Sequence, residues 1–254
     1  MASDPVLAAY EALAPIYNDF NHRNDYEMWL GEVLLPELEK RGLRKGRALD
    51  VACGTGRAFA PLLRRGWQVR GCDLSPAMLE IARREAGEEV ELSLADMREL
   101  PVYGEFELVL VLNDSIDYLL ADEELESALR GIRSNMAGGG LLLFDCNARH
   151  RYETSLTSAV DEFEHRGRRW TWRGLGPVPG NPSVFEARLE GSDIEPILHR
   201  QRFRTEAEVR DAMGAAGLEP LAALGLEEVG DQVVLAEPPD QGRHVKVVHI
   251  ARAA

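Results

Sequence analysis

A short apolar run that ends in a glycine turn does most to limit what this chain can fold into. Residues 48–52 form the run, and Gly54 and Gly56 follow with one residue between them. Glycine adopts backbone angles that other residues resist, and its missing side chain leaves room for a ligand against the main chain. A helical pattern comes next, and a second apolar run, 68–72, leads to Asp73. This order predicts a strand, a ligand-binding turn, a helix and a second strand that ends at a carboxylate.

Strand-like and helix-like segments alternate along much of the chain. Strands are predicted for the apolar runs at 48–52, 68–72, 90–94, 106–112 and 141–145, and helices for 59–65, 76–85 and 122–137. Two further helices are predicted before them, over 5–20 and 25–41. Strands that alternate with helices at this spacing indicate an α/β fold with a parallel sheet covered on both faces.

The pattern changes between about residues 159 and 204. Gly- and Pro-rich turns separate four alternating segments, which predict an antiparallel meander with strands at 160–165, 168–173, 184–189 and 197–204. The first pattern then returns, with a capped helix at 205–217, strands at 218–224 and 245–251, and a loop between those strands at 225–244. We therefore expect three regions: N-terminal helices that cover the active site (1–44), an α/β core (45–158 and 205–254) and an inserted β-sheet (159–204).

The composition limits the partners that we expect. The chain of 254 residues has a formal net charge of −14, which repels phosphate backbones, so nucleic acid is not an expected partner. The three cysteines lie in or beside apolar runs without a C-x-x-C pair, so we expect buried thiols and no metal site. The N-terminus lacks the basic and apolar regions of a signal peptide, and no apolar run approaches the roughly 20 residues that cross a bilayer. We expect a cytoplasmic protein that does not bind a membrane.

The glycine turn favours one kind of ligand over another. A helix that follows such a turn points its N-terminal N–H groups at the ligand. Dinucleotide-binding turns carry a third glycine at the position that Phe59 holds here. A ligand whose anionic group is a carboxylate is therefore favoured over a phosphate. The Gly-x-Gly pair alone is equally consistent with an ordinary tight turn.

Carboxylates also follow the second and third predicted strands. Asp73 can accept both hydroxyls of a ribose, or it can cap the helix that begins at Pro76. Ser75 is able to make that cap alone, which leaves Asp73 for a ligand. Asp96 can accept the amine of an adenine while Met97 covers the ring, although Asp96 is also consistent with an acid on a surface loop.

Together, these motifs resemble those of class I S-adenosylmethionine-dependent methyltransferases. The resemblance covers residues 45–147 strongly and 205–252 in general pattern. It rests on four segments in order: Asp50-x-Ala-Cys-Gly-Thr-Gly56, Asp73-Leu-Ser-Pro-x-Met78, Asp96-Met97, and Phe106-Glu-Leu-Val with Asn113-Asp-Ser after it. It implies S-adenosylmethionine as cofactor and a Rossmann-like, seven-stranded sheet whose last strand runs antiparallel. Ala52 departs from the family, which usually has glycine there, but alanine is small enough to fit.

The resemblance implies roles for individual residues. Asp50 and the 54–56 turn would hold the methionine part of the cofactor, and Asp73 the ribose. Asp96 and Met97 would hold the adenine, and Asn113 would lie under the sulfonium. The full set of cofactor-binding residues carried over in this way is Asp50, Ala52, Cys53, Gly54, Thr55, Gly56, Asp73, Leu74, Met78, Asp96, Met97 and Asn113.

Candidate catalytic residues lie after the fourth and fifth predicted strands, where ligands enter folds of this kind. Asp114 can orient or deprotonate an amine, or it can cap the start of a helix. Tyr118 can face the acceptor or pack inside the protein, and His150 is either a base or a solvated loop residue. Tyr17 resembles the tyrosine that the N-terminal helices of the family fold over the cofactor, or it packs in an amphipathic helix.

The inserted sheet is expected to form a lid over the acceptor or a surface for a homodimer. Trp170 and Trp172 share one face of a strand, which can cover a small acceptor or meet a second subunit. The last strand places Arg200, Arg202 and Arg204 on one face, a row more typical of a solvated face than of an anion site.

We therefore expect a methyltransferase that acts on a small-molecule acceptor by in-line displacement of the methyl group. Similar insertions in glycine and amino-sugar N-methyltransferases favour an amine nitrogen over a hydroxyl as the acceptor. Two alternatives stay open: an oxidoreductase with a nicotinamide cofactor, against which Phe59 argues, and a non-catalytic module that binds S-adenosylmethionine.

Overall fold

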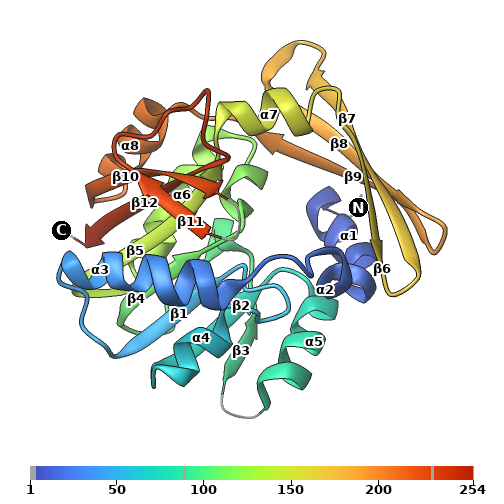
Figure 1. Ribbon diagram of the computed structural model, residues 1–254. Helices are drawn as coiled ribbons and strands as arrows, with labels where there is room; N and C mark the ends of the chain where they lie inside the picture. Colours follow the sequence, from blue (N-terminus) through green and yellow to red (C-terminus); the bar gives the residue numbers. More distant parts are fainter. Residues whose placement is uncertain (1–3, 88–89, 230–231, 254) are drawn as a thin grey trace.

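Two β-sheets of different size organise the protein (Figure 1). The computed structural model describes residues 4–87, 90–229 and 232–253. Residues 1–3 of the predicted N-terminal region and residues 88–89, 230–231 and 254 of the predicted core lie outside the described residues. Among the described helices, none is both long and apolar enough to span a membrane.

The larger sheet has eight strands in the order β11-β10-β12-β5-β4-β1-β2-β3. The strands are β1 (Arg47–Val51), β2 (Gln68–Asp73), β3 (Glu91–Leu94), β4 (Phe106–Val111), β5 (Met136–Asn147), β10 (Leu218–Val229), β11 (Gln232–Ala236) and β12 (Lys246–Ala253). Strands β1 to β5 pair in parallel, whereas β12 is antiparallel to both β5 and β10. The α/β class and the antiparallel last strand are thereby confirmed.

Helices cover both faces of this sheet because β4 is apolar on both sides. Leu108 and Leu110 face a cluster that includes residues of η2 (Glu27–Leu34), α3 (Leu35–Lys40) and α4 (Phe59–Arg64). Val109 and Val111 face the opposite cluster, where α6 (Asp122–Arg133) and α8 (Glu206–Ala215) pack. The remaining helical segments are α1 (Pro5–Leu13), η1 (Ala14–Ile16), α2 (Tyr17–Phe20), α5 (Pro76–Ala86), η4 (Met97–Glu99), η5 (Ser115–Tyr118) and α7 (Arg149–Ser155).

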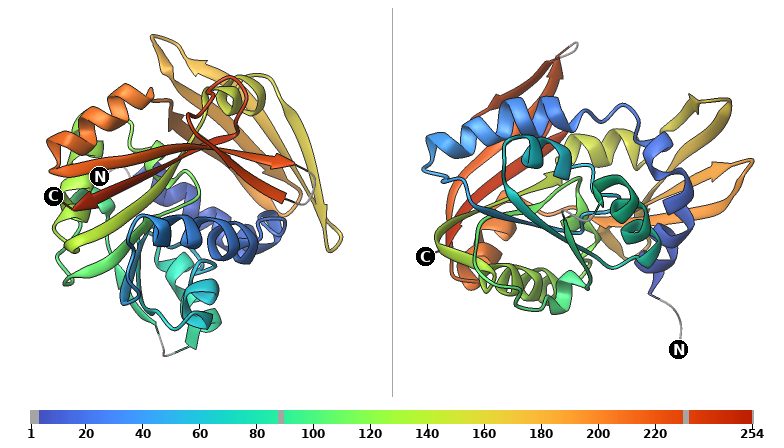
Figure 2. Two further views of the ribbon diagram at one scale, coloured as in Figure 1. Left: turned by 60° about the vertical axis from the view of Figure 1, so that its left-hand side comes forward. Right: turned by 90° about the horizontal axis from the view of Figure 1, so that it is seen from below.

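The smaller sheet is an antiparallel meander inserted between α7 and α8. Its strands are β6 (Val160–His165), β7 (Arg168–Val178), β8 (Asn181–Gly191) and β9 (Ile194–Arg202), paired in sequence order. It projects from the larger sheet on the side of the N-terminal helices (Figure 2). Trp170, Leu189 and Ile197 pack against Ala9 and Leu13 of α1. Part of the aromatic face of the meander, around Trp170, is therefore covered by α1 of the same chain. A homodimer through the inserted sheet stays a prediction.

The expected loop at 225–244 is wrong in its first half. β10 continues to Val229, and β11 follows as an antiparallel partner that pairs Leu226 with Leu235. The sheet consequently has eight strands where the family resemblance implied seven. The apolar residues Val233 and Leu235 of β11 pack against the core cluster, which explains why this segment forms a strand.

The predicted end of the helix at residue 137 is also wrong. α6 ends at Arg133, and β5 already begins at Met136, which pairs with Phe106 of β4. Asn135 anchors this early end, because its buried side chain accepts the Tyr103 N–H at 2.7 Å and donates to the Pro101 carbonyl at 3.0 Å. The three glycines that follow residue 137, Gly138 to Gly140, lie inside β5.

Helix α7 was not predicted. It begins directly after β5 and carries Tyr152, which is fully buried against Phe185 and Phe203 of the inserted segment. The Trp172 indole N–H donates to the Ser155 carbonyl at the end of this helix, at 2.9 Å. These contacts with distant residues add to the ion pair between Arg149 and Glu153 within the helix.

Candidate active site

The glycine turn after β1 has the left-handed backbone that the sequence predicts. Gly54 and Gly56 have φ angles of 55° and 78°. A Cβ atom on Gly56 would lie 2.5 Å from the ring of Phe59, and one on Gly71 would lie 2.6 Å from the same ring. The fully buried Phe59 thus occupies the space under the turn where a dinucleotide-binding fold has its third glycine.

Ala52 also has a left-handed backbone, with φ of 58°. Size was the expected reason why alanine is tolerated here, but conformation is the property that sets this position apart. Holding a residue other than glycine in this left-handed conformation costs roughly 1–2 kcal/mol. The chain therefore carries local strain beside the turn at a position where the related family usually has glycine.

Asp73 fastens the end of β2 to the glycine turn. Its carboxylate accepts the Gly54 N–H at 2.8 Å and the Ser75 N–H at 2.8 Å. Ser75 caps α5 by accepting the Met78 N–H, as expected, but Asp73 is not left free by that cap. Burial raises the pKa of Asp73, whereas these backbone hydrogen bonds lower it. Each carboxylate oxygen keeps a lone pair for a ligand.

Asp50 is the clearest sign of a cationic ligand. Its carboxylate is 2% exposed and has no hydrogen-bond or ion-pair partner among residues 4–87, 90–229 and 232–253. Burial, followed by the charge of Asp73, raises its pKa well above the usual value. A buried carboxylate is costly unless a cation pairs with it. The amino group of an amino acid would satisfy Asp50.

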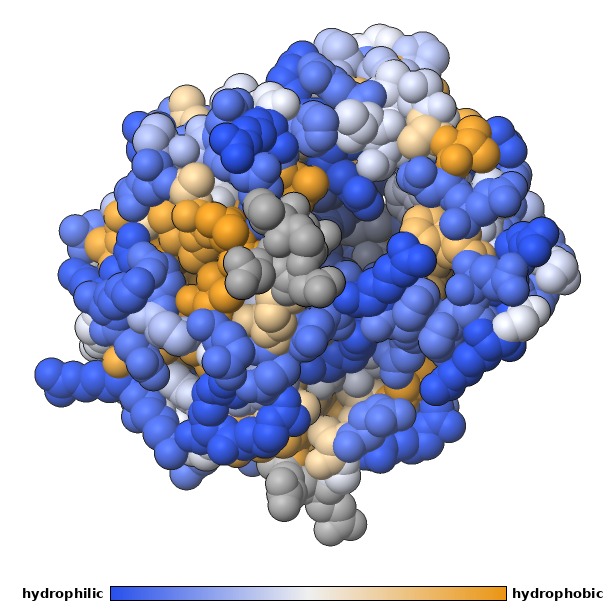
Figure 3. Space-filling model, in the orientation of Figure 1, coloured by the Kyte–Doolittle hydropathy of each residue, from blue (hydrophilic) through white to orange (hydrophobic). Residues whose placement is uncertain are grey.

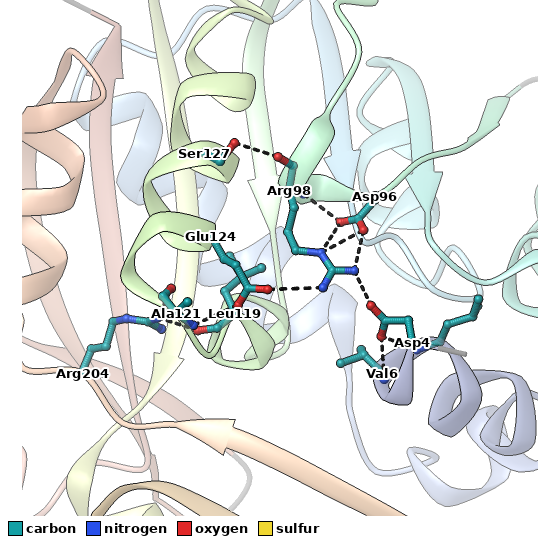
Figure 4. A network of polar contacts seen from close by, with 10 residues as sticks. Asp4, Val6, Asp96, Arg98, Leu119, Ala121, Glu124, Ser127 and Arg204 are labelled. Carbon is teal, nitrogen blue, oxygen red and sulfur yellow. Dashed lines mark hydrogen bonds and ion pairs between the residues drawn. The ribbon is translucent and has the colours of Figure 1, made fainter. Parts of the chain in front are cut away.

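Arg98 holds the acid at the end of β3 in place (Figure 4). Its guanidinium donates to both carboxylate oxygens of Asp96, from Nε at 2.9 and 3.0 Å, and it also binds Asp4 and Glu124. Asp4 caps α1 by accepting the Val6 N–H. Arg98 was not predicted, and it links the end of β3, the N-terminal helix and α6 through one planar group.

Two consecutive left-handed residues, Asn113 and Asp114, follow β4 with φ of 62° and 53°. The Asp145 carboxylate accepts both of their backbone N–H groups, at 2.7 and 2.9 Å. Lys246 donates to Asp145 at 2.5 Å and to Asp114 at 2.6 Å, and Gln201 donates to Asp114 at 2.6 Å. Both oxygens of the Asp114 carboxylate thus already accept hydrogen bonds within the protein.

Two pockets open along this edge of the sheet. The first, which we call the strand-tip pocket, is lined by residues at the ends of β1 to β4 and by α1, namely Val6, Leu7, Tyr10, Tyr17, Tyr26, Asp50, Ala52, Cys53, Gly54, Ala58, Asp73, Leu74, Ser75, Ala95, Asp96, Met97, Arg98, Leu112, Asn113, Ser115, Tyr118 and Leu119. Nine of the twelve predicted cofactor residues lie in this list. Thr55, Gly56 and Met78 do not line this pocket. The Thr55 hydroxyl donates a hydrogen bond to the Asn18 side chain, and Met78 packs in the core.

The second pocket, which we call the lid pocket, lies between the N-terminal helices and the inserted sheet. Its lining comprises Tyr10, Leu13, Tyr17, Phe20, Asn21, Asn24, Asn113, Asp114, Tyr118, Asn147, Arg151, Leu156, Asp161, Phe163, Trp172, His199, Gln201, Leu226, Val245 and Lys246. Four residues line both pockets: Tyr10, Tyr17, Asn113 and Tyr118. Figure 3 shows a hollow on this face, within a surface that is otherwise mostly hydrophilic.

Three of the four predicted catalytic residues meet at this shared wall. Tyr17 accepts a hydrogen bond from the Asn113 side-chain amide at 3.3 Å, and burial raises its pKa to about 12. Tyr118 lies beside Tyr10, with ring centroids 5.4 Å apart, and its hydroxyl is 2.8 Å from Nδ1 of His199. Asp114 lines the lid pocket directly behind this wall.

His150 is the exception. It lies in the first turn of α7 and lines neither pocket, and its backbone N–H donates to the Gln241 carbonyl. The next residue, Arg151, lines the lid pocket instead. Because residues 149–155 form a helix, one position decides which side chain faces the pocket. His150 therefore lies outside both pockets, and its role as a base stays a prediction that this geometry does not favour.

Several lid-pocket residues were missed by sequence reasoning. His199 and Gln201 share a face of β9, a two-residue spacing that was visible beside the arginine row but had no motif to identify it. Burial lowers the pKa of His199 to about 4, so its imidazole is neutral near pH 7. Lys246 is one of three lysines in the chain and gave no local signal.

The arginine row on β9 is not a simple solvated face. Arg200 pairs with Glu186, but Arg202 donates to the Leu120 carbonyl at 2.8 Å. Arg204 is 6% exposed and donates to the carbonyls of Leu119 and Ala121 (Figure 4). Two of the three arginines therefore hold the segment that follows Tyr118, which fixes one side of the shared wall.

Comparisons with known proteins agree with this geometry. A family model described as a methyltransferase domain matches residues 48–140, which contain the ends of β1 to β4. The chain is 31% identical over 220 residues to the putative methyltransferase YqeM of Bacillus subtilis, covering 83% of this chain and 86% of that protein. It is 34% identical over 216 residues to the glycine/sarcosine N-methyltransferase of Parasynechococcus marenigrum, covering 82% and 73%. The fold is similar to that of an S-adenosylmethionine-dependent methyltransferase from Clostridium acetobutylicum, with a TM-score of 0.78, 18% identity and coverage of 96% and 99%.

Proposed function

Because this chain belongs to the class I S-adenosylmethionine-dependent methyltransferases, we propose that it transfers the methyl group to the amine nitrogen of a small molecule held in the lid pocket. The observation that carries this proposal is the wall shared by the two pockets. A donor bound at the strand tips and an acceptor bound under the inserted sheet meet only there.

The residues of the strand-tip pocket fit S-adenosylmethionine. The unpaired Asp50 carboxylate suits the amino group of the methionine part, and the turn at Gly54 lies beside it. The lone pairs of Asp73 are available to the ribose hydroxyls. Asp96, whose two carboxylate oxygens bind Arg98, lies where the resemblance implies the adenine. When bound, S-adenosylmethionine supplies a methyl group that is activated by its sulfonium.

In this mechanism the protein contributes mainly by holding the acceptor and the methyl donor in position. In-line displacement needs acceptor and methyl about 3 Å apart and aligned, and fixing that geometry removes much of the barrier. Asn113 and Tyr17 hold each other by a hydrogen bond at the wall, and Asp145 fixes the backbone of Asn113. Tyr118 and Asn113 present oxygen atoms that can accept the N–H groups of an amine.

Asp114 has a positioning role in this proposal. Its oxygens are bonded to Lys246 and Gln201, so it joins the wall to β12 and to β9 of the inserted sheet. An amine that arrives as ammonium loses its proton to solvent before it attacks. The inserted sheet and the N-terminal helices then act as the lid that separates the acceptor from bulk water.

The carboxylates of the lid pocket and the nitrogen acceptor named for the relative from Parasynechococcus marenigrum support an amine over a hydroxyl. The test is incubation of the protein with S-adenosylmethionine labelled in its methyl group and a panel of small amines and phenols. We expect label on amines. Label found only on phenols would show that the acceptor is a hydroxyl and not an amine. Label on no compound would contradict the proposal.

A further inference from the structure

The lid pocket is bounded by an unbroken series of aromatic rings. In order of contact the rings are Tyr17, Tyr10, Tyr118, His199, Trp172, Phe20 and Phe163. Successive ring centroids are 6.5, 5.4, 6.1, 5.2, 6.5 and 5.3 Å apart. All seven rings line the pocket, and they come from three separate parts of the chain. Such convergence follows from the tertiary structure alone.

These rings are not a sealed core. All except His199 are only half-buried, so they keep surface that a ligand can reach. The strand β7 gives an internal comparison, because Trp170 on the same face is 1% exposed and packs against α1. Trp172, two residues along, is half-buried and faces the pocket. The structure closes one indole into the core and leaves the other at the cavity.

The charges around the rings favour a cation. Burial lowers the pKa of His199 to about 4, so the series of rings carries no positive charge near pH 7. Lys246 is paired with Asp114 and Asp145, and the lid pocket is also lined by the carboxylate of Asp161. The remaining cation of the lining, Arg151, is an exposed side chain.

We propose that the lid pocket is an aromatic cage for a methylated ammonium group, and that the acceptor amine is methylated repeatedly until it is quaternary. Ring faces attract a cation within about 6 Å of their centroids, most strongly when water is excluded. Each added methyl group removes an N–H that needs a hydrogen-bond acceptor and adds apolar surface that fits the rings. This inference rests on the proposed function, since it concerns the acceptor of the same reaction.

The chemistry balances with one S-adenosylmethionine for each methyl group. In every step the nitrogen lone pair forms the new N–C bond, the C–S bond breaks, and its electron pair stays on sulfur as S-adenosylhomocysteine is formed. After the first two transfers to a primary amine, the product ammonium loses a proton to water and regains its lone pair. The third transfer gives a quaternary ammonium that has no proton to lose.

Two probes of nearly the same shape test the cage without knowledge of the acceptor. Choline carries a trimethylammonium group, and 3,3-dimethylbutan-1-ol replaces the charged nitrogen by carbon. Each is titrated by calorimetry into the protein saturated with S-adenosylhomocysteine. We expect choline to bind at least tenfold more tightly. Equal binding of the two probes, or no binding of choline, would overturn the proposal.

Trp172→Phe and Trp172→Leu form a matched pair, because both remove the indole N–H that donates to the Ser155 carbonyl. Phenylalanine keeps an aromatic face, whereas leucine keeps only apolar volume. We expect choline affinity to fall less than threefold in the first variant and at least tenfold in the second, with unchanged affinity for S-adenosylhomocysteine. Equal losses in the two variants would contradict the cage. Phe163→Leu repeats the test if Trp172→Leu does not fold.

The labelled-donor assay distinguishes failure of the cage from failure of the proposed function. If amines gain label but the protein does not prefer choline, the proposed function stands and the cage is contradicted. If the protein prefers choline but labels no amine, the cage stands as a binding site and repeated methylation is contradicted.

Discussion

The Asp73 carboxylate accepts a hydrogen bond from the backbone N–H of Gly54, with the two atoms 2.8 Å apart. This contact ties the end of β2 to the turn after β1, which are neighbours in the sheet. The residue proposed to hold the ribose therefore also shapes the turn proposed to hold the methionine part. A substitution at Asp73 is expected to affect both.

Asp73→Ala should reduce affinity for S-adenosylmethionine at least tenfold and lower the free energy of unfolding. The variant leaves the N–H groups of Gly54 and Ser75 without their acceptor, which costs roughly 1–3 kcal/mol for each buried group. Calorimetric titration and chemical denaturation measure the two effects. Asp73→Asn, which retains one acceptor oxygen, is the control and should lose less stability. Affinity of the alanine variant equal to that of the wild type would refute the assignment.

Asp50→Asn should stabilise the protein without ligand while weakening donor binding at least tenfold. Burial raises the pKa of Asp50 in the folded state, so its contribution to stability is present below the unfolded value and is lost as pH rises through the folded value. The substitution removes that loss. We expect the gain in melting temperature to be larger at pH 8 than at pH 4. A gain that is independent of pH would show that ionisation of Asp50 is not its source.

Ala52→Gly should raise the free energy of unfolding by roughly 0.5–1 kcal/mol. The strain energy released at φ of 58° is larger than the stability lost through the extra conformational entropy that glycine gives the unfolded chain. Denaturant unfolding measures the change. Ala82→Gly, inside helix α5, is a control and should be destabilising by at least roughly 0.5–1 kcal/mol, because it adds chain entropy and also removes a buried methyl group. A loss of stability at both positions would contradict the assignment of strain to Ala52.

Lys246→Met should destabilise the protein by about 2–4 kcal/mol, because it leaves Asp114 and Asp145 without their shared cation. The two carboxylates would then repel each other with no cation between them. Chemical denaturation at pH 8 tests the prediction. A second change, Asp114→Asn, should restore part of the loss at pH 8, whereas no rescue would show that charge is not the cause.

Tyr118→Phe should lower kcat/KM for the acceptor about threefold to tenfold, the effect of one hydrogen bond, and leave donor affinity unchanged. The hydroxyl pairs with His199 of the inserted sheet and lies at the wall between the two pockets. Steady-state kinetics with an amine identified by the labelled-donor assay provide the measurement. Tyr103→Phe, at a tyrosine that lines neither pocket, is the control. An equal effect in both variants would remove Tyr118 from the mechanism.

Sequence alone predicted most of the strand-tip pocket because its residues follow strands directly. Gly54, Asp73 and Asp96 each come after a recognisable apolar run, and the carboxyl ends of parallel strands meet at one edge of a sheet. Local order along the chain therefore determines that these groups converge. The resemblance to the family added Asn113, which lines this pocket, and an antiparallel last strand.

The lid pocket was decided by the tertiary structure. His199 and Gln201 reach the wall from a strand more than 80 residues away from Tyr118 and Asp114, and no local pattern records that pairing. The side chain of a short helix that faces the pocket, Arg151 in place of His150, depends on how α7 packs against the inserted sheet. Short-range sequence patterns set where strands end and what they carry, whereas packing between distant segments sets which side chains meet. The donor was consequently evident from the sequence, and the shape of the acceptor site required the fold.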